Sequence, residues 1–451
     1  MMERRTGEIA ALLGADLRGA DDVLVQGVAF DSREVAPGNL FVALPGERAD
    51  GHAFVGAAAA RGAAAALVAR PCGDAALPQL VVTDTLDALQ RLAADQRYRG
   101  GFRLAAVTGS VGKTSTKEHL AAFLATTFPT GATRDSRNSQ AGFPTELCNQ
   151  PEGIAWMVAE LGMNHPGELD RLGRIARPDA LLYTVVAPVH LEFFPDLDAI
   201  AEAKAELIPH LAADGVLVLN AADRRVAALA PRFAGRVVTY GAPGVSHLWI
   251  EDYRSRGLLG STFSLCSTQE RWPLSLPLPG RHSADNVLAA AACALSLGVP
   301  PESLPPRAAT LTPPPRRGVV HRLPSGITVV DDSYNASPVA VQRLLELLGE
   351  TPGRRVAVLG EMLELGAGAP AFHAQVGAAA GQVAAVVVAV GGSNAEVLAR
   401  AAAPAECRVV RDAAGAADVL SGLLRPGDVV LVKGSRGVGL DRVVDALVEA
   451  G

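Results

Sequence analysis

A short glycine-rich segment holds the residues whose chemistry is easiest to predict. It reads Thr108-Gly-Ser-Val-Gly-Lys-Thr114, and it lies between the apolar run Leu104–Thr108 and a helical pattern. Glycines let backbone N–H groups converge on phosphate oxygens, and the helix start adds partial positive charge. Lys113 would reach the β- and γ-phosphates, and the Thr114 hydroxyl would bind Mg2+. The expected ATP-binding residues are Thr108, Gly109, Ser110, Val111, Gly112, Lys113, Thr114 and Ser115.

The loop alone does not choose among nucleotide enzymes. The strict phosphate-loop spacing would need glycine at position 107, where a valine stands. A glycine-rich turn that happens to contain a lysine is the structural alternative, but the strand before the loop and the helix after it favour the phosphate-binding interpretation. Kinases and GTPases share such loops. The chain has no NKxD sequence, so nothing supports guanine recognition.

Lysine is rare in this chain. Among 41 basic residues only four are lysines, at positions 113, 117, 204 and 433, which leaves 37 arginines. An amine is a compact phosphate ligand and, when neutral, a nucleophile, whereas a guanidinium stays protonated. We expect functional reasons for Lys113, Lys204 and Lys433, and for Lys117 no role beyond chance retention.

Three further residues have the chemistry of a metal or phosphate site. Glu160 ends an apolar strand, and in open α/β sheets ligands bind beyond the carboxyl ends of strands. His190 follows the next strand, and Lys204 lies on an amphipathic helix. Taken singly, a solvated glutamate, a core histidine and a surface lysine would be the ordinary interpretations.

The chain alternates strand-like runs with helical stretches over most of its length. The expected strands are Leu40–Leu44, Ala64–Val68, Leu80–Thr83, Leu104–Thr108, Trp156–Glu160, Ala180–Val186, Val216–Asn220, Thr328–Asp332, Arg355–Leu359, Val383–Val390 and Val429–Val432. Such alternation predicts largely parallel sheets with helices on both faces. Residues 236–278 differ, because their alternating, Ser/Thr-rich runs suggest a small antiparallel annex. The proline cluster Thr312–Pro315 suggests a linker.

We therefore predict an α/β protein of three domains, a number that the length of 451 residues also favours. Residues 1–98 would form a small mixed α/β domain. Residues 99–311 would form a doubly wound, mostly parallel P-loop domain with the antiparallel annex. Residues 312–451 would form a Rossmann-like domain.

Composition narrows the environment and the partners. The formal net charge of −6 argues against non-specific binding of nucleic acid or an anionic membrane. Five scattered cysteines, none spaced as CxxC, fit a reducing cytoplasm and offer no zinc site. The longest strongly apolar stretch, Val383–Val390, is far too short to cross a membrane. We expect a soluble cytoplasmic protein that acts as a monomer.

Taken together, the motifs resemble the Mur ligase family, and among its members those that add D-Ala-D-Ala. The family carries TGxxGKT, a strand-end glutamate, a histidine, and a lysine fourteen residues beyond it, as Lys204 follows His190 here. The other segments that carry the resemblance are Phe30-Asp-Ser-Arg33, Pro37-Gly-Asn-Leu-Phe-Val-Ala-Leu44, Asp50-Gly-His-Ala-Phe54, Glu160-Leu-Gly-Met-Asn-His-Pro-Gly-Glu168, Leu278-Pro-Gly-Arg-His282 with Asn286, Asp331-Asp-Ser-Tyr-Asn-Ala336 and Val432-Lys-Gly-Ser-Arg436.

The resemblance implies that ATP phosphorylates the terminal carboxylate of a UDP-N-acetylmuramoyl-tripeptide and that the amine of D-Ala-D-Ala then forms an amide. It implies catalytic roles for Lys113, Glu160, His190, Lys204 and Arg317, with Mg2+ held by Thr114, Glu160, His190 and a carbamylated Lys204. Asn138, Asn286, Arg317 and Asp332 would contact the nucleotide. The implied substrate-binding residues are Ser32, Arg33, Asp50, His52, Asn138, Tyr334, Asn335, Lys433 and Arg436.

The family pattern is not fully kept, and two other functions stay open. The usual NNxxGxP reads Arg137-Asn-Ser-Gln-Ala-Gly-Phe-Pro144, and PGRHN ends in Ser283. Another amide ligase of the superfamily, such as MurE or a folylpolyglutamate synthetase, is the nearest alternative. A catalytically silent ATP-binding subunit is a second. The segments between residues 30 and 54 resemble a uridine-binding first domain and argue against the folate enzyme, whereas the motifs at 331–336 and 432–436 argue against MurE. Joint retention of Lys113, Glu160, His190 and Lys204 argues against the silent subunit.

Overall fold

The computed structural model describes residues 2–46, 49–73 and 76–450. The elements of its first part are β1 (Glu3–Arg5), α1 (Thr6–Leu13), β2 (Asp16–Arg18), β3 (Leu24–Gln26), β4 (Val28–Ala29), β5 (Leu40–Val42), α2 (Val55–Ala60), β6 (Ala65–Val68), β7 (Gln79–Val81) and α3 (Thr85–Arg99). The described strands form a five-stranded sheet in the order β2-β7-β6-β5-β4, in which β2 alone runs antiparallel, and a separate antiparallel pair, β1 and β3.

The central part is the largest. Its elements are β8 (Arg103–Thr108), α4 (Lys113–Leu124), β9 (Thr130–Ala132), α5 (Gly142–Cys148), β10 (Trp156–Glu160), α6 (Glu168–Ala176), β11 (Ala180–Tyr183), α7 (Leu197–Ala205), β12 (Val216–Asn220), α8 (Arg224–Ala227), β13 (Arg236–Tyr240), β14 (Trp249–Ser255), β15 (Ser261–Cys266), β16 (Arg271–Leu276), α9 (Arg281–Ser296) and α10 (Leu304–Ala308). Strands β13-β12-β11-β8-β10-β9 form one parallel sheet, and β14-β15-β16 form an antiparallel one.

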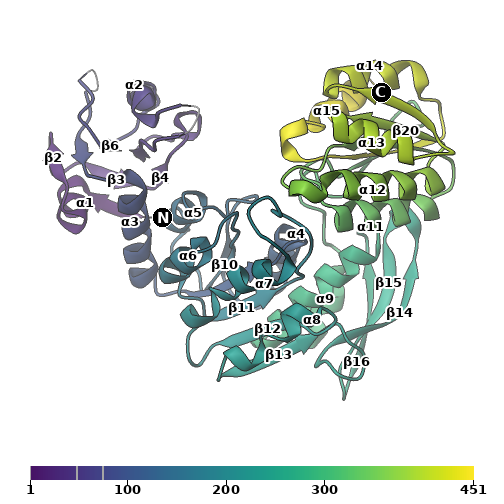
Figure 1. Ribbon diagram of the computed structural model, residues 1–451. Coiled ribbons are helices and arrows are strands. Elements are labelled where there is room, and N and C mark those ends of the chain that lie inside the picture. Colours follow the sequence, from purple (N-terminus) through teal and green to yellow (C-terminus); the bar gives the residue numbers. More distant parts are fainter. Residues whose placement is uncertain (1, 47–48, 74–75, 451) are drawn as a thin grey trace.

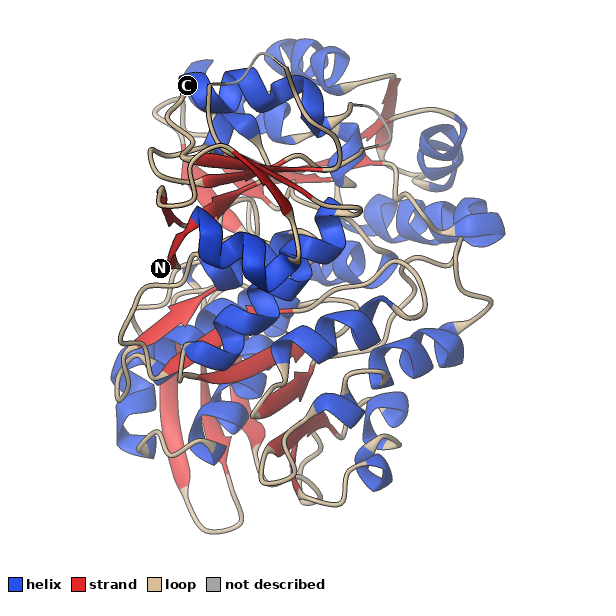
Figure 2. Cartoon of the chain, turned by 90° about the vertical axis from the view of Figure 1, so that its left-hand side faces the viewer, coloured by secondary structure: helices blue, strands red, loops and turns tan. Residues whose placement is uncertain are grey.

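Both faces of the central parallel sheet are covered, as Figure 2 illustrates. Along β8, Leu104 and Ala106 point into a core with α5 and α6, whereas Ala105 and Val107 point into a second core with α4 and α9. This alternation explains why the strand reads as a continuous apolar run, since each of its faces is buried. The parallel ladder brings the carboxyl ends of β8, β10 and β11 to one edge of the sheet.

The third part is a second doubly wound unit. Its elements are β17 (Val319–Arg322), β18 (Thr328–Asp331), α11 (Pro338–Glu350), β19 (Arg354–Gly360), α12 (Ala369–Val383), β20 (Val386–Val390), α13 (Ser393–Ala401), β21 (Glu406–Val410), α14 (Ala413–Leu423), β22 (Asp428–Lys433) and α15 (Asp441–Ala450). The described strand order is β17-β18-β22-β19-β20-β21, parallel except for β17. The predicted fold of three α/β domains is confirmed.

Several details of the prediction are wrong. Strand β13 belongs to the parallel sheet, not to the antiparallel annex, because it pairs with β12 in parallel register. It is an edge strand with a half-exposed, alternating pattern, and such a pattern resembles that of an antiparallel hairpin. The run Val383–Val390 is divided, since α12 extends through Val383 and β20 begins at Val386.

In Figure 1 the central part lies lowest, with the first part at its upper left and the third part at its upper right. The first and central parts share one hydrophobic core, in which α3 residues Leu89 and Leu92 meet Phe143 and Leu172. The third part has its own cores, and it joins the central part through the irregular segment that contains Thr312–Pro315. No helix in the described ranges is long and apolar enough to span a membrane.

Candidate active site

The glycine-rich loop connects β8 directly to α4, as predicted. Gly109 has φ 142° and Gly112 has φ 83°, a region that side chains rarely adopt. A Cβ atom at Gly109 would lie 1.9 Å from Thr184 Oγ1, and one at Gly112 would lie 2.4 Å from Asn286 Oδ1. These two positions therefore require glycine for both shape and space. The loop ends at the N-terminus of α4, a twelve-residue helix whose partial positive charge suits an anion.

The loop also holds a buried hydroxyl without a hydrogen bond. Ser110 Oγ has no partner among the described residues, and Ser110 lines a cavity. Lys113 Nζ donates to the carbonyl oxygens of Gly109 and Ser110 at 2.9 and 3.3 Å, so the ammonium lies over the loop. Burial lowers the pKa of Lys113, and Glu160 opposes that shift. An orphaned hydroxyl, a lysine and a helix N-terminus at one place fit a polyphosphate.

Glu160 at the end of β10 is the centre of an oxygen-rich cluster. The Thr114 hydroxyl donates to Glu160 Oε2 at 2.6 Å, and Asn138 Nδ2 donates to Glu160 Oε1 at 2.5 Å. Glu160 is only 1% exposed. Hydroxyl and carboxylate oxygens are the ligands that Mg2+ prefers, so these residues fit the metal that the sequence implies.

His190 and Lys204 stand on the other side of the loop. His190 follows β11 with φ 57°, and its Nδ1 lies 2.5 Å from Glu364 Oε2 of the third part. Burial lowers the pKa of His190, with Lys113 and Lys204 adding to the shift and Glu364 opposing it. Lys204 on α7 is 2% exposed, and burial, helped by Lys113, holds its pKa well below the usual value. Among the described residues, no three His, Cys, Asp or Glu side chains form a ready metal site.

A cavity of about 890 Å3 lies between the central and third parts. Most of the predicted site residues line it, and they come from both parts: Ser110, Val111, Gly112, Lys113, Thr114, Ser115, Asn138, Glu160, His190, Asn286, Arg317, Asp332, Tyr334, Asn335, Lys433 and Arg436. Thr108 and Gly109 are not among the described lining residues of this cavity. Thr108 Oγ1 donates to the Leu161 carbonyl at 2.9 Å, which holds the start of the loop. Within the described ranges Lys204 is not a lining residue.

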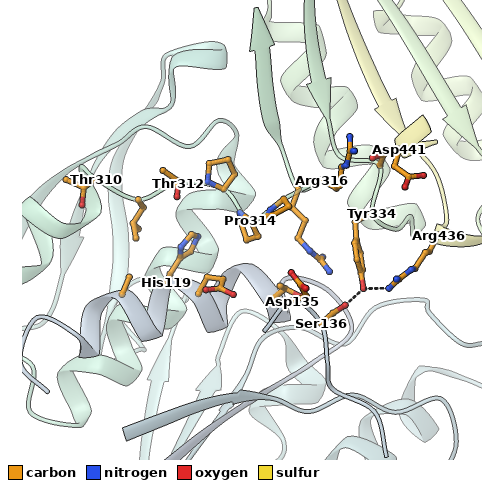
Figure 3. Close-up of a pocket in the computed structure, with 18 of the residues that line it drawn as sticks. His119, Asp135, Ser136, Thr310, Thr312, Pro314, Arg316, Tyr334, Arg436 and Asp441 are labelled. Carbon is orange, nitrogen blue, oxygen red and sulfur yellow. Dashed lines mark hydrogen bonds between the residues drawn. The ribbon is translucent and has the colours of Figure 1, made fainter. Parts of the chain in front are cut away.

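The wall from the third part is built around Tyr334. The Arg317 guanidinium lies 4.1 Å from the centre of the tyrosine ring, and that of Arg436 lies 5.2 Å from it. Arg436 Nη1 donates to the tyrosine hydroxyl at 2.8 Å, and the hydroxyl also bonds to Ser136 of the central part (Figure 3). Figure 3 shows this contact at the edge of a second cavity, of about 700 Å3, next to the linker.

Lys433 reaches the same wall from the end of β22. It is 3% exposed, and its Nζ donates to the Asn335 carbonyl at 2.8 Å and lies 3.3 Å from Asp332 Oδ2. Its pKa is lowered by burial, against the effect of Asp332. The motifs around 332–335 and 433–436, about a hundred residues apart in the chain, therefore meet at one surface.

The four residues predicted in the first domain lie outside both cavities. Ser32 begins a short 3-10 turn, and Arg33 is bound to Asp31 with most of its side chain exposed. Asp50 bonds to His52 Nδ1 at 2.6 Å and to Arg70 at 2.5 Å, which lowers the pKa of its carboxyl. His52 Nε2 accepts from the Ala69 N–H at 2.8 Å. Both ring nitrogens of His52 are thus used inside the protein, so the ring can shape a substrate site but not bond to a ligand.

Other residues of the site were not foreseen from the sequence. Lys117 is fully buried and donates to the carbonyls of Thr133 and Asp135, so the expectation of an incidental lysine is wrong. Glu364 and Ser136 contact the opposite part of the protein. The rule that selected Glu160 could have found Glu364, because it too lies just beyond the end of a parallel strand, β19.

Comparison with known proteins agrees with this geometry. Three family models match: the "Mur ligase family, catalytic domain" over residues 24–97, the "Mur ligase middle domain" over 107–294 and the "Mur ligase, glutamate ligase domain" over 316–436. A UDP-N-acetylmuramoyl-tripeptide–D-alanyl-D-alanine ligase of Escherichia coli is 36% identical over the full length of both chains.

Solved structures give the same result. A MurF structure from Acinetobacter baumannii superposes with a TM-score of 0.88 at 29% identity and covers 100% of this chain and 99% of its own. MurF from Thermotoga maritima in complex with ADP superposes with a TM-score of 0.79 at 29% identity, covering 94% of this chain and 97% of its own. Motifs, cavity, family models and full-length relatives all agree: the chain belongs to the Mur ligase family.

Proposed function

We propose that this chain is the ATP-dependent ligase that joins D-Ala-D-Ala to UDP-N-acetylmuramoyl-tripeptide and so makes the UDP-N-acetylmuramoyl-pentapeptide of peptidoglycan synthesis. The observation that carries the proposal is the 890 Å3 cavity, which Lys113, Thr114 and Glu160 line together with Arg317 and Lys433 from the third part. The full-length relatives named for this reaction support it.

The chemistry follows from the groups at the cavity. A carboxylate oxygen of the tripeptide attacks the γ-phosphorus, the bond to ADP breaks, and an acyl phosphate forms. The amine of D-Ala-D-Ala then attacks the acyl carbon, the C–O bond to phosphate breaks, and a proton leaves the nitrogen. Several negative charges gather in the first step, so Lys113 and Arg317 would stabilise them electrostatically.

Mg2+ would supply further charge neutralisation between the phosphates when bound. Thr114, Glu160 and His190 would hold it, together with Lys204 once its amine has added to CO2 and lost a proton. The lowered pKa of Lys204 supports this modification, because only the neutral amine has the free electron pair that attacks CO2. Asn138 would position the γ-phosphate or the substrate carboxylate beside Glu160.

The remaining residues would bind the ends of the substrates. Asn286 and Asp332 would contact the nucleoside. The nucleotide or the dipeptide would be bound by Tyr334, Asn335, Lys433 and Arg436. Ser32, Arg33, Asp50 and the supporting His52 would form the uridine end on the first domain. We further propose that the protein works in the cytoplasm, which the five free cysteines support, and that it acts as a monomer.

A phosphate-release assay tests the function. With ATP, Mg2+ and UDP-N-acetylmuramoyl-tripeptide, adding D-Ala-D-Ala should start phosphate release and yield the pentapeptide by mass spectrometry. Versions of the tripeptide with lysine, ornithine or diaminopimelate at the third position would identify the natural one. Phosphate release that does not depend on D-Ala-D-Ala would rule the function out, and no release at all would favour an ATP-binding subunit.

A further inference from the structure

A carboxylate of the third part contacts the predicted metal-binding histidine of the central part. His190 Nδ1 and Glu364 Oε2 lie 2.5 Å apart. The two residues belong to different parts, since His190 follows β11 and Glu364 follows β19. Both side chains line the 890 Å3 cavity, together with Lys113, Thr114 and Glu160.

The backbones around this pair are also fitted closely. The Glu192 N–H donates to the Glu364 carbonyl at 3.2 Å. A Cβ atom at Gly366 would lie 2.9 Å from the Leu191 carbonyl oxygen, so a side chain there would separate the two segments. The contact of the two side chains is therefore supported by close backbone packing on both sides.

Both residues of the pair have a strained backbone. His190 has φ 57° and Glu364 has φ 62°, although neither is glycine. Such conformations are unfavourable for residues other than glycine, and they persist where the surrounding structure determines them, often at functional sites. Here one strained residue lies in the central part and the other in the third part, and together they bring the imidazole and the carboxylate into contact.

Bonding at Nδ1 leaves the other ring nitrogen available. When Nδ1–H donates to a carboxylate, Nε2 carries the lone pair, and metal-binding histidines are commonly oriented in this way. We propose that Glu364 is a positioning residue that orients His190 toward the Mg2+ of the proposed reaction, so that the metal site is complete only when the third part contacts the central one. This proposal rests on the proposed function, because it takes His190 as a metal ligand.

Metal affinity gives a readout besides turnover. Mn2+ can replace Mg2+ as a probe, and its binding to the protein with a non-hydrolysable ATP analogue can be measured by electron paramagnetic resonance. We expect Glu364→Ala to weaken Mn2+ binding about 10- to 100-fold, the usual effect of losing such a supporting contact. ADP affinity in EDTA should stay within about 2-fold, because the metal is then absent from both proteins.

Matched variants separate positioning from a general structural effect. Glu396→Ala removes an exposed carboxylate of the same part, on α13, and should leave Mn2+ affinity unchanged. In a His190→Gln background, Glu364→Ala should cause no further loss, because the ring that it orients is gone. Glu364→Asp, which keeps the charge but shortens the side chain, should also weaken Mn2+ binding, and it serves if the alanine variant does not fold.

Two results would overturn the proposal. One is Mn2+ affinity in Glu364→Ala and Glu364→Asp equal to that of the unaltered protein. The other is a loss of ADP affinity in EDTA as large as the loss of Mn2+ affinity, which would mean that Glu364 only holds the two parts together. Failure of the proposed function is distinguishable, since it would appear as missing D-Ala-D-Ala-dependent phosphate release in the unaltered protein, whereas the Mn2+ comparison needs no turnover.

Discussion

Burial is the main cause of the lowered pKa of Lys204, and the nearby Lys113 adds to the shift. The side chain is 2% exposed and its pKa lies well below the ordinary value for lysine. Replacing it with arginine keeps a long cationic side chain but removes the possibility of a carbamate, since guanidinium stays protonated. We expect Lys204→Arg to reduce ligation on the order of 100-fold or more, as when one transition-state-stabilising group is lost.

Two quantities test Lys204→Arg: the rate of phosphate release and the affinity for ADP. ADP should bind with nearly unchanged affinity, and short carboxylic acids should restore part of the activity by taking the place of the carbamate. Full activity in Lys204→Arg would show that no carbamate is needed.

The burial of His119 predicts that mild acid destabilises the protein. It is 1% exposed on α4, its Nδ1 has no hydrogen-bond partner in the described structure, and burial lowers its pKa to about 4 from 6.5. Between those values the unfolded chain binds a proton that the folded protein excludes. We therefore expect the contribution of His119 to be neutral above pH 6.5 and to destabilise the folded state as the pH falls toward 4, by about 3 kcal/mol in all.

His119→Met should remove this acid sensitivity. The free energy of unfolding, from urea titrations at pH 7 and pH 4.5, should fall less for the variant than for the unaltered protein. His247→Gln, which alters an exposed ring, is the control. An identical pH dependence in His119→Met and the unaltered protein would contradict the assignment.

At the scale of elements, Lys117 joins the phosphate-loop helix to the segment that carries Asn138. Its ammonium bonds to the carbonyls of Thr133 and Asp135, at the start of a loop that ends with Asn138 on Glu160. Lys117→Met keeps most of the apolar stem but leaves two carbonyls with no partner. We expect a loss of about 1–3 kcal/mol in the free energy of unfolding.

Hydrogen exchange would locate the effect of Lys117→Met. Amides of residues 133–138 should exchange faster, whereas those of β12 should not change. A variant with unchanged stability and unchanged exchange would mean that the buried ammonium does not hold this segment.

Sequence patterns predict the strands that are buried on both faces, but they do not predict the strands at the edges of the sheets. Strands β10 and β12 match the prediction residue for residue, because each is a short apolar run between helices. Strands β17 and β21 were missed, and both are edge strands with polar, partly exposed residues. An edge strand has one neighbour, so its sequence need not be apolar on both faces.

The same division holds for the site. Motif residues such as Lys113 and Glu160 were predictable, because their chemistry depends on residue type and on a strand or helix end. Glu364, Lys117 and Ser136 act through partners 16 to 198 residues away in the chain, and no local pattern specifies such pairs. The motif around residue 52 predicts that His52 binds substrate, yet its ring nitrogens bond to Asp50 and to the Ala69 N–H.

On the scale of the whole molecule, Tyr334 connects two parts that have separate cores. Its hydroxyl accepts from Arg436 and bonds to Ser136 across the boundary. Tyr334→Phe keeps the ring next to the guanidinium groups of Arg317 and Arg436 and removes only these bonds, each worth about 1 kcal/mol. We expect the KM for ATP to rise several-fold, and small-angle X-ray scattering with ADP to show a more extended average shape.

Two comparisons make the Tyr334→Phe result decisive. Ser136→Ala should have a similar but smaller effect, and the double variant should add little. Tyr98→Phe alters a ring that is 82% exposed and should change nothing. Unchanged KM and unchanged scattering in Tyr334→Phe would mean that the hydroxyl does not help to bring the parts together.

The proline cluster Thr312–Pro315 has a consequence for how often the two walls of the cavity meet. Three consecutive prolines each fix φ near −65°, so this tether samples few conformations. A stiff tether of suitable span keeps the third part at a high effective concentration over the phosphate loop, and little chain entropy is lost at each encounter. A flexible Gly-Ser tether of equal length would lower that effective concentration and make encounters less frequent, although every contact of the site would remain.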